Sequence, residues 1–142
     1  MSKEKLSKQE VDHINIYSDS WIQIIHSLTG AQLNYDDESI KFMEEYIEKM
    51  RLDPKQTLYE EKKTLIGYFF GNCLIQKYGG DWVNPEYPMV QIGTLTANPL
   101  YKVSKQFDNG LQDSISGLVA VVGVALQSPE TFFKLDDDNI PS

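Results

Sequence analysis

Apolar residues recur at helical spacing in three long segments of the N-terminal half of the chain. This spacing predicts helices over residues 8–28, over residues 37–51, and from residue 57 or 59 to residue 77. Residues 37–51 have the cleanest pattern, with acids at the first end and bases at the last, where each suits the helix dipole. The third helix is apolar around more than half of its circumference, so we expect it to be central and buried.

Two glycines, Gly67 and Gly71, lie one turn apart inside the third predicted helix. A glycine in a helix costs roughly 1 kcal/mol relative to alanine. A pair at this spacing therefore predicts that another main chain packs closely against this face of the helix. The glycine pair Gly79-Gly80 is predicted to end the helix, because glycine readily adopts the left-handed conformation of a C-cap.

After Gly80 the pattern changes from helical to strand periodicity. Residues 82–83 and 89–96 are predicted strands that pair as an antiparallel ribbon. A capping asparagine followed by proline predicts that a helix begins at Asn98-Pro99. Asn109-Gly110 interrupts or bends this helix, and helical periodicity resumes over residues 111–126. Residues 118–124 are rich in valine and are alternatively a strand, but periodicity and length favour a helix.

The expected fold is a single α+β domain over residues 1–135, with about four helices packed on a small antiparallel sheet. A short helical turn is expected after Ser128, and residues 136–142 are expected to form an acidic disordered tail. The longest apolar run, residues 118–126, is far shorter than the about 20 residues that a membrane span requires. We therefore expect no membrane segment.

Cysteine use and the N-terminus favour a cytoplasmic protein. Cys73 is the only cysteine, so no internal disulfide is possible, and its apolar surroundings predict a buried thiol. The chain contains no Asn-x-Ser/Thr sequence. Its first residues are charged and lead into an amphipathic segment, which is unlike a secretory signal.

The formal net charge of −8 is unevenly distributed. Residues 36–61 contain nine acids and four bases and residues 106–142 six acids and one base, whereas residues 62–105 contain five bases and two acids. Nucleic-acid binding is disfavoured, because phosphate contacts need a basic patch. The acidity either maintains solubility or forms an interface for a basic protein partner. The candidate interface residues are Asp36, Asp37, Glu44, Glu45 and Glu48.

No set of residues in the sequence indicates catalysis or a bound cofactor. His13 and His26 lie on one predicted helix, about 20 Å apart along its axis, too far to share a metal. Residues 136–139 are acidic but lack the glycine and the terminal glutamate of a calcium loop. No nucleophile elbow, phosphate loop or dinucleotide fingerprint occurs. We assign no catalytic residue, metal ligand or cofactor.

A polar pocket between the ribbon and the fourth helix is a second hypothesis. Trp82 and Tyr87 come from the ribbon, and Asp113 and Ser114 follow the break in the fourth helix. These four residues are the candidate binding residues for a small ligand or substrate. The alternative is that Asp113 and Ser114 serve only as turn and capping residues.

The segment over residues 65–119 resembles a family of small bacterial domains of unknown function. The features in common are a glycine-spaced helix, a Gly-Gly-x-Trp turn, a short strand pair and a helix that opens with Asn-Pro. They are carried here by Gly67, Gly71, Gly79, Gly80, Asp81, Trp82, Val90, Gln91, Ile92, Gly93, Asn98, Pro99, Val103, Phe107, Gly110, Asp113 and Ser114. This resemblance implies a fold more than a role.

Acidic bacterial proteins of this size without a catalytic motif also look like immunity proteins, and that resemblance implies neutralisation of a toxin by binding. The first functional hypothesis is therefore a non-enzymatic domain that binds a basic protein, with an immunity-type inhibitor as its specific form. The second is a small ligand-binding or enzymatic domain that uses the pocket described above. The third is a structural homo-oligomer formed through an aromatic patch.

Overall fold

The computed structural model describes residues 4–53 and 59–127, which form five α-helices, one 3₁₀ turn and three short strands. The predictions for the turn after Ser128 and for the tail over residues 136–142 lie outside these residues. In chain order the elements are α1 (Lys8–Thr29), α2 (Asp37–Arg51), α3 (Tyr59–Tyr78), β1 (Asp81–Val83), β2 (Met89–Ile92), β3 (Leu95–Ala97), α4 (Pro99–Asn109), η1 (Gly110–Asp113) and α5 (Ile115–Gln127).

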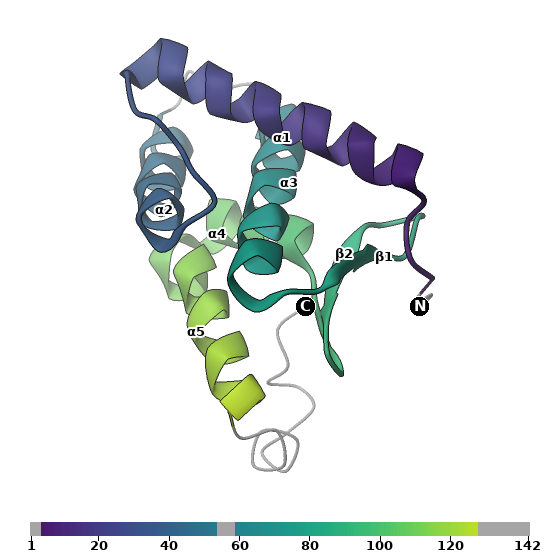
Figure 1. Cartoon of the computed structure of the whole chain (residues 1–142). Helices are drawn as coiled ribbons and strands as arrows, with labels where there is room; N and C mark the ends of the chain where they lie inside the picture. Colours follow the sequence, from purple (N-terminus) through teal and green to yellow (C-terminus); the bar gives the residue numbers. More distant parts are fainter. Residues whose placement is uncertain (1–3, 54–58, 128–142) are drawn as a thin grey trace.

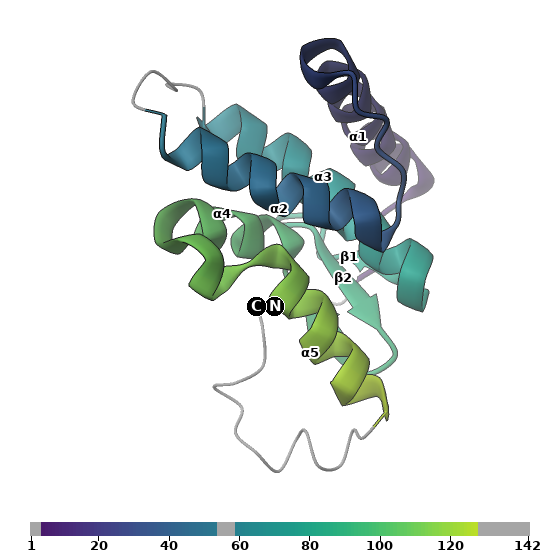
Figure 2. The same cartoon turned by 90° about the vertical axis from the view of Figure 1, so that its left-hand side faces the viewer.

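Helix α3 lies in the middle of the molecule, where α1 crosses it and α4 packs against it (Figure 1). Five apolar side chains in its middle are buried, which confirms the predicted central helix. They are Ile66, Phe69, Phe70, Cys73 and Leu74. Helix α2 packs beside α3 and also contacts α4 and α5 (Figure 2). The core is therefore formed mainly between helices.

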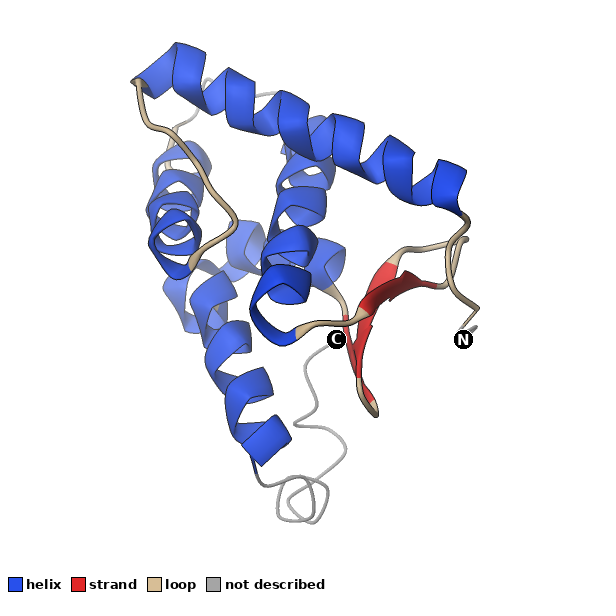
Figure 3. Ribbon diagram, in the orientation of Figure 1, coloured by secondary structure: helices blue, strands red, loops and turns tan. Residues whose placement is uncertain are grey.

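The three strands form an antiparallel sheet of order β1-β2-β3 at one edge of the helices, against α3 and α4 (Figure 3). The predicted ribbon is confirmed, with Trp82 opposite Val90. Residues 89–96 are not one strand as predicted, because the chain reverses after Ile92 and Leu95 pairs back with it. Gly93 has a φ of 61°, the conformation that a two-residue hairpin turn requires and that glycine adopts without strain.

The segment that precedes α1 runs along the outer side of β1. The Leu6 amide donates to the Trp82 carbonyl at 3.1 Å, and the Asn84 amide donates to the Glu4 carbonyl at 2.8 Å. Ser7 and Glu10 then form a capping box that starts α1. These bonds hold the first turn of α1 next to the turn between β1 and β2.

The α+β class is confirmed, but residues 4–53 and 59–127 form five α-helices and not about four. Gly110, with φ 78° and ψ −155°, ends α4, and Ser114 is extended, so α5 leaves at an angle of 87° to the preceding segment. Residues 118–124 lie within α5, which confirms the helix that periodicity favoured over a strand. In the described part of the chain, no single helix has the length and apolarity needed to cross a bilayer. The segments Pro99–Asp113 and Ile115–Gln127 have that length and apolarity only when they are counted together, and they are bent by 87° at the break between them.

The two glycines of α3 do mark a close approach, but mostly of side chains. A Cβ atom on Gly71 would overlap the indole ring of Trp82 and lie 3.1 Å from the side chain of Pro99. At Gly67 it would overlap the side chain of Leu100, and the Leu100 Cα would lie at 3.1 Å. The predicted main-chain contact is therefore present only at Gly67. At Gly71 a buried aromatic ring occupies the space.

We predict that Gly71→Ala destabilises the protein by about 1–3 kcal/mol, the usual cost of overpacking a rigid core. This loss would appear even though alanine favours a helix by about 1 kcal/mol. Urea unfolding followed by circular dichroism measures the change. Gln23→Ala, on the exposed side of α1, is the matched control and should leave stability unchanged or slightly higher. An equal or higher denaturation midpoint for Gly71→Ala would contradict the packing described here.

Candidate functional site

Trp82, the first of the four predicted pocket residues, is part of the core. Its side chain is only 3% exposed, and its indole Nε1 donates to Asn72 Oδ1 at 3.0 Å. The amide of Asn72 in turn donates to Asn15 Oδ1 at 3.0 Å, so the three side chains connect β1, α3 and α1. Trp82 therefore positions the sheet and has no free polar group to offer a ligand.

Tyr87 lies in the turn between β1 and β2 and is 44% exposed. Partial burial raises the pKa of its hydroxyl, and nearby Tyr101 of α4 adds to this effect. Tyr101 is also exposed and lies under the ammonium group of Lys105, which is 5.5 Å from the ring centre. Tyr87 thus belongs to an exposed patch beside α4 and not to an enclosed pocket.

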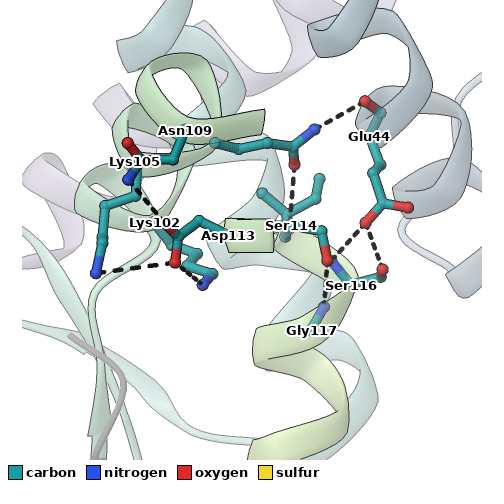
Figure 4. Close-up of polar contacts among 10 residues, drawn as sticks. Glu44, Lys102, Lys105, Asn109, Asp113, Ser114, Ser116 and Gly117 are labelled. Carbon is teal, nitrogen blue, oxygen red and sulfur yellow. Dashed lines mark hydrogen bonds and ion pairs between the residues drawn. The ribbon is translucent and has the colours of Figure 1, made fainter. Parts of the chain in front are cut away.

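Asp113 and Ser114 lie at the junction of η1 and α5 (Figure 4). Asn109 Nδ2 donates to Asp113 Oδ2 at 2.7 Å, and the ammonium groups of Lys102 and Lys105 lie 3.7 and 3.9 Å from Asp113 Oδ1. Burial lowers the pKa of Lys102, against the opposing effect of Asp113. Ser114 Oγ accepts from the Gly117 amide at 3.2 Å, which is the capping role that the sequence offered as the alternative.

The four predicted pocket residues therefore have separate partners. Among the residues that the structure describes, no hydrogen bond, ion pair or ring contact joins Trp82 or Tyr87 to Asp113 or Ser114. The structure does not bring them together into one site. The physical reason is that Trp82 is needed under the sheet, whereas Asp113 and Ser114 are needed to end one helix and start the next.

The amide groups at the start of α5 are satisfied by side chains from three helical segments, which we call the α5 cap cluster. The Ile115 amide donates to Gln106 Oε1 at 2.9 Å, and the Ser116 amide donates to Glu44 Oε1 at 3.2 Å (Figure 4). The Ser116 hydroxyl also donates to Glu44 Oε1. With Ser114 on Gly117, the first three amides of the helix are paired. The carboxylate of Glu44 therefore occupies the position where an anion would bind.

Gln106 is the centre of this cluster, and it is completely buried. Its Nε2 donates to the Glu44 carbonyl at 2.9 Å and to Glu48 Oε2 at 3.0 Å, while its Oε1 accepts from the Ile115 amide. One side chain on α4 thus binds α2 and α5 together. Three of the four hydrogen-bonding positions of its amide are thus used toward other helices.

The predicted acidic interface is divided by these contacts. Glu44 and Glu48 turn toward α4 and α5, and Glu48 Oε1 also lies 3.6 Å from a guanidinium nitrogen of Arg51. Asp36 caps α2 by accepting from the Ser39 amide at 2.8 Å. Asp36 and the remaining two candidates, Asp37 and Glu45, are exposed. Asp37 pairs with Lys77 at 2.8 Å, and Glu45 is exposed.

We predict that Gln106→Leu, which keeps a similar volume, destabilises the protein by at least about 2 kcal/mol. It leaves a buried amide and a carboxylate without their partner, and each such loss costs about 1–3 kcal/mol. Thermal and urea unfolding measure the loss. Gln112→Leu, on the exposed side of η1, should change stability by less than about 0.5 kcal/mol. Equal effects of the two substitutions would show that the α5 cap cluster is not needed for stability.

A second region, which sequence reasoning did not identify, lies where α1, α3 and the turn between β1 and β2 meet. Two surface hollows of about 400 and about 480 Å³ adjoin there and have His13 and Tyr68 in common. We call them together the α1–α3 groove. The first is lined by Leu6, Gln9, Glu10, His13, Ile14, Tyr68, Pro85, Glu86 and Pro88, and the second by His13, Tyr17, Glu61, Thr64, Leu65 and Tyr68.

Aromatic rings form a continuous series along this groove. His13 meets Tyr17 edge to face at 4.5 Å between ring centres, Tyr17 lies 6.2 Å from Tyr68, and Tyr68 meets Trp82 edge to face at 6.0 Å. Partial burial raises the pKa of Tyr68, and Tyr17 raises it further. Tyr68, which lines both hollows, is thereby in contact with the buried ring of Trp82. Tyr17 lies on the exposed side of α1, and Tyr68 comes from α3. Only the packing of α3 against α1 brings the two rings together, so the sequence alone gives no signal of the groove.

Cys73 is inaccessible, as the sequence predicted. Its side chain is 1% exposed, and burial raises the pKa of its thiol well above the usual range, with a smaller effect from Asp36 and Asp37. His13 and His26 are exposed on α1. In residues 4–53 and 59–127, no three metal-binding side chains lie together.

We predict that the Cys73 thiol reacts with an aromatic disulfide reagent at pH 8 more slowly in the native protein than in denaturant. The expected difference in rate is on the order of a hundredfold or more. The reactive species is the thiolate, which burial disfavours, and access requires local opening. The released chromophore measures the rate. A fast native reaction would place Cys73 at the surface.

The chain was compared with protein-family models, with curated proteins and with solved structures, and it matches none of them. The resemblance over residues 65–119 to a bacterial domain family therefore stays a prediction. The function has to be argued from the described residues themselves.

Proposed function

We propose that this chain is a cytoplasmic, non-enzymatic domain that binds a basic protein, and that an immunity-type inhibitor of a basic toxin is its specific form. The net charge of −8 is the starting point. Intramolecular contacts already use several of the carboxylates that the sequence offered as an interface, so the proposal rests on the carboxylates that remain.

The observation that carries the proposal is a set of exposed glutamates without a cationic partner. In the described part of the chain, Glu38 and Glu45 on α2, Glu61 on α3 and Glu86 in the turn between β1 and β2 are exposed and form no ion pair. Uncompensated surface charge of one sign attracts a partner of the opposite sign and speeds association. The helices and strands described above do not depend on an ion pair of these four carboxylates.

The alternative of a small ligand-binding or enzymatic domain has weaker support. It depended on Trp82, Tyr87, Asp113 and Ser114 lining one pocket, and these residues have separate partners. The polar groups that do converge, in the α5 cap cluster, satisfy one another. A site for chemistry would need a group that is free to act on a substrate.

The proposal is tested by affinity capture. The immobilised chain is exposed to an extract of the source organism at about 50 mM salt, and bound proteins are eluted by raising the salt. We expect one basic protein to be retained in stoichiometric amount and released as the salt increases. A variant with Glu38, Glu45, Glu61 and Glu86 all replaced by glutamine should retain less of it and release it at lower salt.

The captured protein then tests the inhibitor form of the proposal. We expect its activity, measured alone and with an equimolar amount of this chain, to fall on addition of the chain. A partner that is acidic, a complex indifferent to salt, or no captured protein would contradict the binding function. Full activity of the partner in a saturated complex would contradict the inhibitor role.

A further inference from the structure

We propose that the α1–α3 groove receives an extended segment of the partner in which one large apolar side chain is flanked by lysine or arginine. This inference rests on the proposed function, because it names the place and the chemistry of the contact. Four features of the groove support it: its shape, its apolar walls, its charge and its rigidity.

The shape of the groove fits an extended chain. The two hollows follow α1 in sequence, the first beside Leu6, Gln9 and Glu10 and the second beside Tyr17, with His13 between them. Each volume is within the range of about 300–1,000 Å³ that is typical of ligand pockets. Two adjoining hollows in one line accept successive side chains of a peptide more readily than one compact ligand.

The walls are apolar and already positioned. Leu6, Tyr68, Pro85 and Pro88 are among the residues that line the first hollow, and Leu65 and the rings of Tyr17 and Tyr68 line the second. Proline and tyrosine lose little conformational entropy on binding, so an apolar side chain can be buried here at low cost. This feature distinguishes the groove from a purely electrostatic surface.

The charge of the groove selects the sign of the ligand. Glu10 and Glu86 line the first hollow and Glu61 lines the second, and among residues 4–53 and 59–127 no lysine or arginine lines either one. Glu61 and Glu86 form no ion pair within the described residues, and Glu10 is held at the N-cap by the Ser7 amide at 2.8 Å. A basic side chain would therefore meet a carboxylate at both ends of the groove. It would also lie over the tyrosine rings, which attract cations.

The floor of the groove is connected to the core. Tyr68 contacts the ring of Trp82, and Trp82 is held by Asn72 and by its close packing on Gly71. The segment before α1 is hydrogen-bonded to β1 on the other side. The groove is consequently preformed in the free protein, and binding should require little rearrangement.

Three synthetic peptides test the inference on the full chain. The first, acetyl-Arg-Lys-Phe-Lys-Arg-amide, has the proposed chemistry. The second replaces the phenylalanine by glycine, and the third replaces all four basic residues by glutamate. Calorimetric titration at about 50 mM salt gives the dissociation constants, and ¹H–¹⁵N shift changes locate the peptide. We expect the first peptide to bind, with shifts at Tyr17, Tyr68 and Glu86, and the other two to bind at least tenfold more weakly.

Matched variants separate the groove from general electrostatic attraction. Glu61→Lys with Glu86→Lys should weaken binding of the first peptide at least tenfold, and Tyr17→Ala should weaken it at least threefold. Asp19→Lys on α1 with Asp108→Lys on α4 makes the same change of charge outside the groove and should weaken binding less than threefold. Circular dichroism confirms that each variant is folded. Both pairs of substitutions lie at exposed positions.

Three outcomes would overturn the inference. Equal weakening by the two double variants would show attraction without a groove, and equal binding of the first two peptides would remove the apolar contact. No binding of the first peptide at millimolar concentration would also overturn it. None of these outcomes decides the proposed function, which is tested by capture of the whole partner. A captured basic protein whose retention is unaffected by Glu61→Lys with Glu86→Lys would keep the function and reject the groove.

Discussion

The ring of Trp82 lies on α3 at Gly71, one of the two positions of this helix without a side chain, and much of the structure depends on this contact. The ring can approach the helix axis only because glycine has no Cβ atom. Its nitrogen is then paired with Asn72, and Asn72 is paired with Asn15 of α1. The sheet, α3 and α1 are thereby held at one point. Pro99 approaches the same glycine, so the first turn of α4 is positioned there as well.

A second, polar contact organises the other end of the molecule. Gln106 of α4 is buried, and its side chain pairs with groups of α2 and α5. The carboxylate of Glu44 meets the positive end of α5, and Glu48 pairs with Gln106, so two negative side chains of α2 are partly buried between helices. The acidic surface is therefore distributed differently from what a count along the sequence suggests. The exposed glutamates without an ion pair among the described residues that we use in the proposal lie on α2, on α3 and in the turn between β1 and β2.

The packing on Trp82 also explains why the α1–α3 groove exists. Its walls come from three segments, residues 6–17, 61–68 and 85–88, which the packing on Trp82 brings together. The groove combines apolar side chains with two glutamates, Glu61 and Glu86, that form no ion pair within residues 4–53 and 59–127. A surface of this kind is suited to recognition of a basic and partly apolar segment, since the attraction is long-range and the burial is local.

Local signals were sufficient for most of the secondary structure. The helical period located α1, α2, α3 and α5, and Asn98-Pro99 located the start of α4. The hairpin at Gly93 was missed because alternation continues through it, and only the positive φ of one glycine marks the reversal. The α+β class followed from these elements, since a chain with helical and strand periods in one domain has few other ways to bury its apolar faces.

The positions of the polar side chains could not be predicted in the same way. Periodicity shows which residues are on one face of a helix, but it does not show which element covers that face. Glu44 and Ser116 are 72 residues apart, and Glu44 became an internal cap only because α5 packs against α2. Tyr17 and Tyr68 form a groove for the same reason. The sequence by itself determined the elements and the burial of Cys73 and α3, because those depend on local composition. Only the tertiary structure decided which carboxylates of the described residues pair within the molecule and where the α1–α3 groove lies, because those depend on contacts between distant segments.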